Sequence, residues 1–165
     1  MNFKVHRITV LNLERKDKAL TLLTEVAAQV QPIMRARSWS VPHLAEANFS
    51  NASIHGMNHN AGELIELRLR PARDLSSFFS LEHCVGTMLH ELCHIVHGNH
   101  SAEFYALLDK LYAEWQQNVS KGVRGSGAGF DATGHKLSRE AHNPVTVEEA
   151  RQKALLAAQK RLQMS

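Results

Sequence analysis

Several of the eleven histidines of this chain crowd into one short segment, HELCHIVHGNH at positions 90–100. His90 and His94 are four residues apart, which on a helix separates two side chains by about 6 Å along the axis and ~40° around it. Both imidazoles can therefore reach one ion. Glu91 follows His90 in the HExxH pattern, in which two histidines bind zinc and the glutamate accepts a proton from the attacking water. The segment predicts a zinc-dependent metallopeptidase with Glu91 as its catalytic acid and base.

A catalytic zinc ion usually has three protein ligands and one open position, so this pattern requires a third ligand. His97 lies on the same helical face but about 10.5 Å along the axis from His90, too far for both to bind one ion. It is better suited to support the site as a hydrogen-bond donor or as a cation at the helix end. His100 follows Gly98, and a glycine in left-handed conformation can end the helix and return the chain to the ion. We therefore predict His100 as the third ligand.

Glu114 is the alternative third ligand. It follows His94 by twenty residues, which is similar to thermolysin-like enzymes with two histidines and a glutamate, but Ala113 precedes it where those enzymes have asparagine. A helix rich in histidines without any metal is a further alternative, although a core helix gains little from clustered imidazoles that must all stay neutral. The predicted ligand set is His90, His94 and His100.

Two helices are predicted to flank the histidine segment. Residues 81–97 form an apolar helix that Gly98 ends, and residues 101–118 form a second helix with one apolar stripe. Tyr105 and Tyr112 on the second helix are candidates to stabilise an oxyanion, because a phenol near the site can donate a hydrogen bond to it. The alternative for both tyrosines is a place in the core.

The segments before these helices predict strands and one more helix. Residues 8–11 are a candidate first strand, and residues 19–30 carry apolar side chains at helical spacing, with Pro32 expected to bend or end that helix. Residues 44–49 are a weaker strand candidate. Residues 64–70 alternate clearly, so their apolar and charged side chains should point to opposite faces of a strand.

We expect a compact α+β, zincin-like domain in which a small mixed sheet packs against helices, including the HExxH helix. The site should lie in a cleft between the sheet edge and that helix. Residues 56–63 contain the glycine and asparagine of a tight turn between strands. Residues 1–120 should form the catalytic core, residues 121–144 a Gly- and Ser-rich loop or arm, and residues 145–165 a terminal helix.

The composition limits the class of protein. The 165 residues, 44% hydrophobic and 21% charged, suffice for one folded domain and exclude a disordered chain. A net charge of +3 with a pI near 9.0 favours an anionic partner only weakly. Two cysteines cannot form a disulfide framework, which indicates a reducing compartment. The N-terminus lacks the apolar region of a signal peptide and no stretch reaches the length of a membrane span, so we expect a soluble intracellular protein.

Four sequence blocks resemble, in order, the pattern of the WLM family, the weak-suppressor-of-SMT-three-like metalloproteases, which are related to the SprT and Spartan enzymes. The blocks are GMNHN at 56–60, LRLR at 67–70, GTMLHELCHIVHG at 86–98 and HSAEFY at 100–105. The resemblance implies His90, His94 and His100 as zinc ligands and Glu91 as the catalytic residue. It further implies DNA-dependent proteolysis of proteins crosslinked to DNA, in the nucleus and in DNA repair, with links to SUMO and to the Cdc48/p97 unfoldase. Segments that would bind those two partners are not evident here.

Five basic residues are candidates for contacts with DNA phosphates. They are Arg68, Arg70 and Arg73 on and after the alternating strand, and Lys121 and Arg124 on the Gly-rich arm. The alternative is that the arginines are ordinary solvent-facing positions of an edge strand. No motif for base-specific reading is present, so we expect sequence-independent, salt-sensitive binding, with single-stranded DNA as the expected form.

Two other functions stay open at this point. The same zinc chemistry would hydrolyse an isopeptide bond, which would make the chain a SUMO or ubiquitin isopeptidase. A non-catalytic adaptor that binds DNA or SUMO would instead hold a structural zinc closed by a fourth protein ligand. Cys93 is the nearby thiol, but its place beside His94 on a helix should turn it away from the ion.

Overall fold

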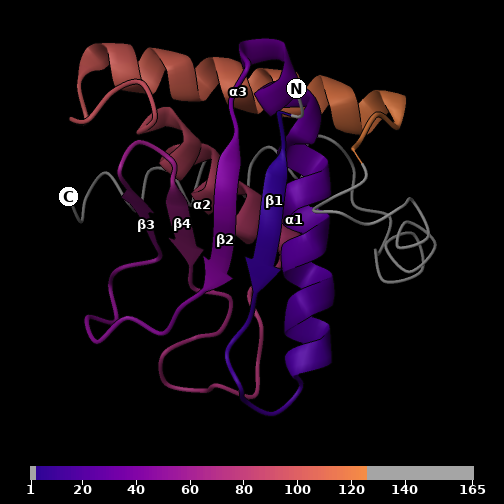
Figure 1. Cartoon of the computed structure of the whole chain (residues 1–165), viewed down its shortest axis with the longest axis vertical. Coiled ribbons are helices and arrows are strands. Elements are labelled where there is room, and N and C mark those ends of the chain that lie inside the picture. The colour runs from indigo at the N-terminus through magenta and orange to yellow at the C-terminus, as the bar shows by residue number, and fades with distance from the viewer. Residues whose placement is uncertain (1–2, 126–165) are drawn as a thin grey trace.

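The computed structural model describes residues 3–125 of the chain. Four strands form one sheet in the order β1-β2-β4-β3: β1 (Val5–Thr9), β2 (Val41–Glu46), β3 (Gly56–His59) and β4 (Leu64–Leu67). β1, β2 and β4 are parallel, and β3 is antiparallel to β4. The helices are α1 (Lys16–Arg37), α2 (Leu81–Cys93) and α3 (Ala102–Lys121), as Figure 1 shows. The predicted α+β class with a small mixed sheet is confirmed.

The helices and the sheet share one apolar core. α1 packs on β1 and β2, α2 packs on β3 and β4, and α3 packs on α1 and α2 (Figure 1). Leu23 and Ile33 of α1, Leu44 of β2, Leu89 of α2 and Leu111 of α3 are all fully buried in this core. Among residues 3–125 no helix is both long and apolar enough to cross a membrane. The packing holds the helix that carries the HExxH segment between the sheet and α3.

The strands differ from the predicted ones at their ends. The first strand begins at Val5 and ends at Thr9, so it precedes most of the predicted range 8–11. Residues 56–63 are not only a turn, because β3 occupies the first four of them. The turn itself follows at Asn60, Ala61 and Gly62, which all have positive φ. The predicted terminal helix and most of the predicted Gly-rich arm lie outside the described residues.

Pro32 was expected to bend or end the first helix, and the second of these two expectations is wrong, because α1 continues through it to Arg37. A proline inside a helix lacks the N–H that would bind the carbonyl four residues earlier, which here belongs to Ala28. That carbonyl oxygen accepts a hydrogen bond from the Gly125 N–H at 2.8 Å. The chain after α3 therefore satisfies the group that Pro32 leaves open. Buried Ile33 and Met34 hold the following turn in the core.

α2 begins at a capping serine and ends earlier than predicted. The hydroxyl of Ser80 accepts a hydrogen bond from the His83 N–H, and the helix ends at Cys93 with His94 as its C-cap. The N–H groups of residues 94, 95 and 96 then bind carbonyls three residues back, which tightens the last turn. Gly98 does not have the positive φ that was expected of it. The tightened turn, rather than a left-handed glycine, begins the return of the chain.

Candidate metal centre

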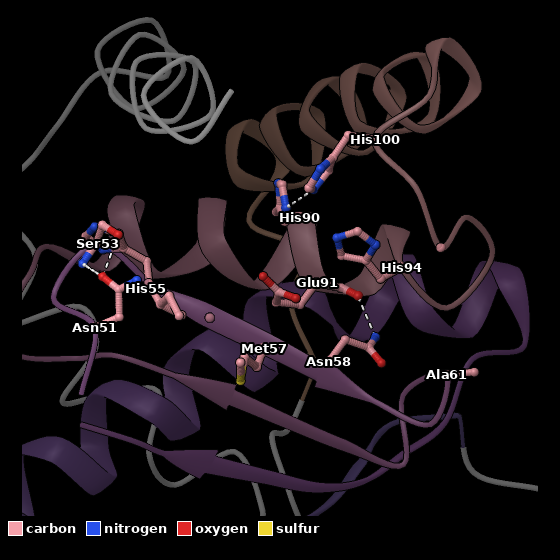
Figure 2. Close-up of a pocket in the computed structure, with 13 residues that line it drawn as sticks. Asn51, Ser53, His55, Met57, Asn58, Ala61, His90, Glu91, His94 and His100 are labelled. Atoms are coloured by element: carbon pink, nitrogen blue, oxygen red, sulfur yellow. Dashed lines mark hydrogen bonds between the residues drawn. The ribbon is translucent and has the colours of Figure 1, made fainter. Parts of the chain in front are cut away.

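Three imidazoles meet at the C-terminal end of α2. His90 lies in the last turn of this helix, His94 is its C-cap, and His100 lies just before α3. One nitrogen of each ring lies within 4.8 Å of the other two, and Nε2 of His90 and Nε2 of His100 are 3.2 Å apart (Figure 2). Two nitrogens bound tetrahedrally to one zinc ion at 2.0–2.1 Å would lie about 3.3 Å apart. The His90–His100 pair matches this spacing, and the three rings are close enough together to hold one metal ion.

Hydrogen bonding and burial prepare two of these rings to bind a metal. Nδ1–H of His94 donates to the carbonyl oxygen of His97 at 3.0 Å, and this tautomer of the neutral ring presents the lone pair of Nε2 to an ion. His97 thus supports the site through its backbone. Burial, and then the neighbouring His94, lower the pKa of His100. A lowered pKa favours the neutral imidazole, which is the form that binds metal.

The Phe104 side chain of α3 supports all three rings. It is fully buried, and its ring centroid lies 4.9 Å from that of His90, 4.7 Å from that of His94 and 5.0 Å from that of His100. Ser101 places this ring, because its hydroxyl caps α3 by accepting a hydrogen bond from the Phe104 N–H. The sequence pattern identified Phe104 only as a core residue. Its contact with the histidines depends on how α3 packs against α2.

The carboxylate of Glu91 lies in the same cleft as the imidazoles (Figure 2). Glu91 is only 4% exposed. β3 positions its backbone: Nδ2 of Asn58 donates to the Glu91 carbonyl at 2.7 Å, and Oδ1 of Asn58 accepts from the Gly62 N–H at 2.8 Å. Asn58 therefore links the β3–β4 turn to the end of α2. This role was missed in the sequence, where GMNHN indicated only a turn and a family block.

A cleft of about 510 Å³ lies where the C-terminal end of α2 meets β3 and the loop that precedes β3. It is lined by residues 51 and 53–58 on one side, by His90 and Glu91 of α2 and the C-cap His94, and by Ala61, Gly98 and His100. The predicted position of the site, between the sheet edge and the HExxH helix, agrees with this cleft. Tyr105 and Tyr112 do not line it. Tyr105 is half-buried with its ring 6.1 Å from that of His100, and Tyr112 is buried, so both are packing residues.

We expect the change Gly56→Ala to displace the Glu91 carboxylate. A Cβ atom at Gly56 would lie 2.7 Å from Cγ2 of Thr87 and 3.0 Å from Oε2 of Glu91, so the helix and the strand must move apart. Overpacking of this kind costs about 1–3 kcal/mol, and a displaced catalytic group lowers kcat/KM by on the order of 100-fold. Chemical denaturation and peptidase kinetics measure the two effects.

The second change Thr87→Ser tests the cause of the Gly56→Ala effect. Serine removes Cγ2 and keeps the hydroxyl that donates to the His83 carbonyl. The double variant should regain stability, but its activity should stay low because the contact with Glu91 remains. An unaltered kcat/KM in Gly56→Ala would show that the carboxylate tolerates the new methyl group.

Two residues that were considered as additional ligands lie away from the cluster. Glu114 forms a bidentate ion pair with Arg37, with N–O distances of 2.8 and 2.9 Å. Among residues 3–125, the three histidines are the only group of three or more side chains able to hold a metal. Cys93 is fully buried, and burial raises its pKa to about 12, which keeps the thiol protonated. The structure therefore offers no support for Glu114 as the third ligand or for a fourth ligand at Cys93.

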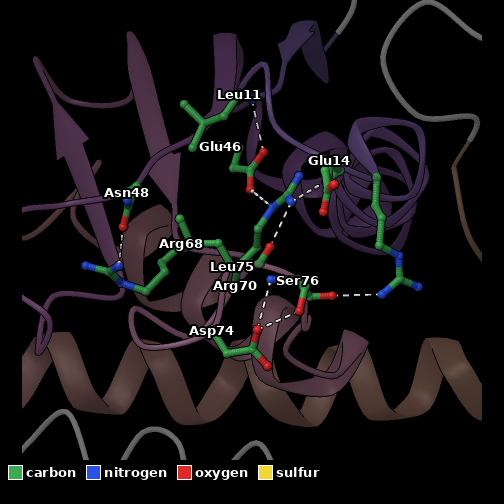
Figure 3. A network of polar contacts seen from close by, with 10 residues as sticks. Leu11, Glu14, Glu46, Asn48, Arg68, Arg70, Asp74, Leu75 and Ser76 are labelled. Carbon is green, nitrogen blue, oxygen red and sulfur yellow. Dashed lines mark hydrogen bonds and ion pairs between the residues drawn. The ribbon is translucent and has the colours of Figure 1, made fainter.

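The arginines proposed to contact DNA fall into different environments. Arg68 and Arg70 are each only 2% exposed, so the prediction that they contact phosphates does not hold for these two residues. Both guanidinium groups bind oxygens inside the protein (Figure 3). Arg124 is half-buried and forms an ion pair with Glu25 at 2.7 Å. Arg73 and Lys121 are exposed, and contact with DNA stays a prediction for them.

The fold and the site together define a metallopeptidase-type domain: an HExxH helix packed on a small mixed sheet, with a third histidine and a buried glutamate at one cleft. The sequence model of the WLM domain matches residues 3–163. The chain therefore belongs to the WLM domain family.

Named relatives and solved structures agree with this family. The chain is 38% identical over 111 residues to the DNA-dependent metalloprotease WSS1 of Saccharomyces cerevisiae, a match that covers 67% of this chain and 41% of the relative. It is 34% identical over 119 residues to the DNA-dependent metalloprotease WSS1 homolog 2 of Schizosaccharomyces pombe, covering 68% of this chain and 42% of the relative. The chain thus spans less than half the length of these relatives.

The crystal structure of Wss1 from S. cerevisiae is similar to this fold with a TM-score of 0.72 and 35% identity, over 74% of this chain and 96% of that chain. Wss1 from S. pombe gives a TM-score of 0.62 and 35% identity, over 70% of this chain and 95% of that chain. These relatives are named metalloproteases, so a metal belongs to their activity. The cluster of His90, His94 and His100 is where this chain can bind one.

Proposed function

We propose that this chain is a zinc metalloendopeptidase that cleaves DNA-bound proteins, including proteins crosslinked to DNA, in a DNA-dependent manner. The observation that carries the proposal is the convergence of His90, His94 and His100 within 4.8 Å beside the carboxylate of Glu91 in one cleft. Zinc is the metal we propose, because three imidazoles with one open position are typical of its hydrolytic sites.

The side chains around the cleft have distinct roles in this proposal. When bound, zinc supplies Lewis-acid polarisation of the scissile carbonyl. Glu91 accepts the proton of the attacking water and then, as the carboxylic acid, gives a proton to the leaving amine. The burial of Glu91 keeps bulk water away from this transfer. Asn58 and Gly56 keep the helix and β3 in register around the carboxylate.

β3 offers a way to hold an extended polypeptide in the cleft. It is the last strand in the sheet order and pairs only with β4 among the described residues. Residues of this strand line the cleft opposite α2. An extended substrate segment can therefore pair with the open backbone groups of β3 and lie across the metal site.

The dependence on DNA rests on the relatives, which are named DNA-dependent metalloproteases. Of the five basic residues predicted to contact DNA, Arg73 and Lys121 are exposed in the described part of the chain. Binding of DNA phosphates by these residues would not depend on the DNA sequence and would weaken at high salt. As part of the same proposal we place the protein in the nucleus and in DNA repair, with SUMO and Cdc48/p97 as partners. The family resemblance is the support for these last assignments.

A cleavage assay tests the proposed function. The purified chain, loaded with zinc, is incubated with a basic protein bound to single-stranded DNA, with the same protein without DNA, and with a SUMO conjugate. We expect cleavage of the DNA-bound protein within its chain, weaker cleavage without DNA, and loss of the stimulation at high salt. Cleavage confined to the isopeptide bond of the SUMO conjugate would instead indicate an isopeptidase. Zinc-loaded protein that cleaves none of these substrates would contradict the proposal.

A further inference from the structure

Arg68 and Arg70, which follow β4 and are separated by Leu69, are equally buried. Only Arg68 binds residues that line the cleft. We propose that Arg68 is a positioning residue whose guanidinium group holds residues 47–55, here called the rim loop, in the conformation that receives substrate. The rim loop supplies residues 51 and 53–55 to the cleft wall. The inference rests on the proposed peptidase function and adds a residue that acts through the loop rather than on the reacting atoms.

The guanidinium group of Arg68 binds the rim loop at four oxygens. Nε donates to the Ile54 carbonyl at 2.9 Å, and Nη1 donates to Oδ1 of Asn48 at 2.9 Å. Nη2 donates to the carbonyls of Phe49 and Asn51 at 2.9 and 3.0 Å. The backbone continues the attachment, since the Arg68 N–H donates to the His55 carbonyl at 2.8 Å. Four of the five N–H donors of one side chain therefore serve a single loop.

The rim loop has little regular structure of its own. Between its two ends, the backbone carbonyls of the loop have no neighbouring strand to pair with, and a buried carbonyl without a partner is costly. Within the loop, the Ile54 N–H binds the Asn51 carbonyl, and the Asn51 side chain accepts from Ser53. These bonds close a local turn but do not join it to the sheet. The ends of the loop are attached separately: the Ala47 N–H binds the Leu67 carbonyl, and the His55 ring contacts that of His83. The Arg68 guanidinium attaches the residues between these ends to the end of β4.

Lysine cannot replace this arginine without loss. The four acceptors lie in different directions around a flat group, and a guanidinium presents its donors in one rigid plane, whereas an ammonium is a single point with three donors. The Arg68 guanidinium also lies 5.5 Å from the centre of the Phe49 ring, which adds a cation–π contact within the same loop. Shape, more than charge, therefore explains an arginine at this position.

Arg70 is a matched control that the structure itself supplies. It is as buried as Arg68, but it pairs with the carboxylate of Glu46 at 2.8 Å and binds the carbonyls of Glu14 and Leu75 (Figure 3). None of these three residues lines the cleft. Arg68, by contrast, has no carboxylate partner in the described chain. Replacing Arg68 therefore leaves no unpaired carboxylate, and the effect falls on the rim loop.

Amide hydrogen exchange tests the attachment without any substrate. In Arg68→Lys we expect the amides of residues 49–55 to exchange on the order of tenfold faster, while the amides of α1 and α3 are unchanged. Arg70→Lys should leave residues 49–55 as protected as in the wild type. Equal acceleration in both variants, or none in Arg68→Lys, would overturn the role of Arg68.

Kinetics on the DNA-bound basic protein then test the consequence for substrate. Arg68→Lys should raise KM by about tenfold with kcat within about twofold of wild type, because the loop contacts the bound chain and not the reacting atoms. Arg70→Lys should change neither constant at a temperature where it is folded. A fall in kcat with KM unchanged would place Arg68 in the chemical step and overturn the inference.

A milder variant covers the case in which Arg68→Lys does not fold. Asn48 is exposed, so Asn48→Ala removes one of the four acceptors without disturbing the core. Asn48→Ala should accelerate amide exchange in residues 49–55 and raise KM, both by smaller factors than Arg68→Lys does. Unchanged exchange rates and an unchanged KM would overturn the inference. If the wild-type protein cleaves none of the substrates, the proposed peptidase function fails. The amide hydrogen-exchange measurement still decides whether Arg68 holds the rim loop, because it needs no substrate.

Discussion

Glu91→Gln should abolish peptide hydrolysis while the protein keeps its metal. Glutamine has the same shape but cannot accept a proton from the attacking water, and loss of a general base costs about 10²–10⁴ in rate. The metal should remain because Glu91 is not one of the three clustered ligands. Cleavage of the DNA-bound protein measures kcat/KM, and elemental analysis of the same preparation measures the zinc content.

Glu103→Gln is the control for this change, because it removes the same charge at an exposed position in the first turn of α3. Its activity and its zinc content should match those of the wild type. Full activity in zinc-loaded Glu91→Gln would mean that another group takes the proton, and the proposed catalytic role would be lost. Loss of zinc from Glu91→Gln would mean that its carboxylate helps to hold the ion.

His100→Ala should release the metal and with it the activity. The ring of His100 supplies one of the three nitrogens, and Nε2 of His90 is 3.2 Å away. Changes in residues that only support a metal ligand already cost 10–100-fold in affinity, so loss of a ligand should weaken zinc binding by more than about 100-fold. Competition with a chromogenic chelator measures the affinity, and the cleavage assay measures the activity.

Two variants separate this ligand from its rivals. His97→Ala should retain zinc, because His94 binds the backbone carbonyl of His97 and not its ring. Glu114→Gln should also retain zinc, and it should cost on the order of 1 kcal/mol because it weakens a partly exposed ion pair with Arg37, whose side chains are 19% and 32% exposed. If Glu114→Gln loses zinc and His100→Ala keeps it, the third ligand is Glu114 and not His100, and the proposed ligand set is wrong.

Local patterns in the sequence predict much of this domain. The spacing of His90 and His94 depends only on helical geometry, and the addition of His100 rests on the need for a third ligand. The structure brings these three side chains together, while zinc binding itself stays a prediction. The alternation of Ile65, Leu67 and Leu69 predicts a strand with one apolar face, and all three are buried. Such features are local because neighbouring residues determine them.

Tertiary structure alone decided which polar groups are available for function. Arg68 and Arg70 occupy the charged positions of the alternating pattern and yet are buried, since their partners come from loops and from the end of β2, which the pattern does not place. Glu114 is taken by Arg37, 77 residues away in the sequence. α1 passes through Pro32 because a glycine beyond α3 satisfies the open carbonyl. Periodicity reports which face of an element is apolar, but a buried polar side chain is stable only where distant segments meet to bind it.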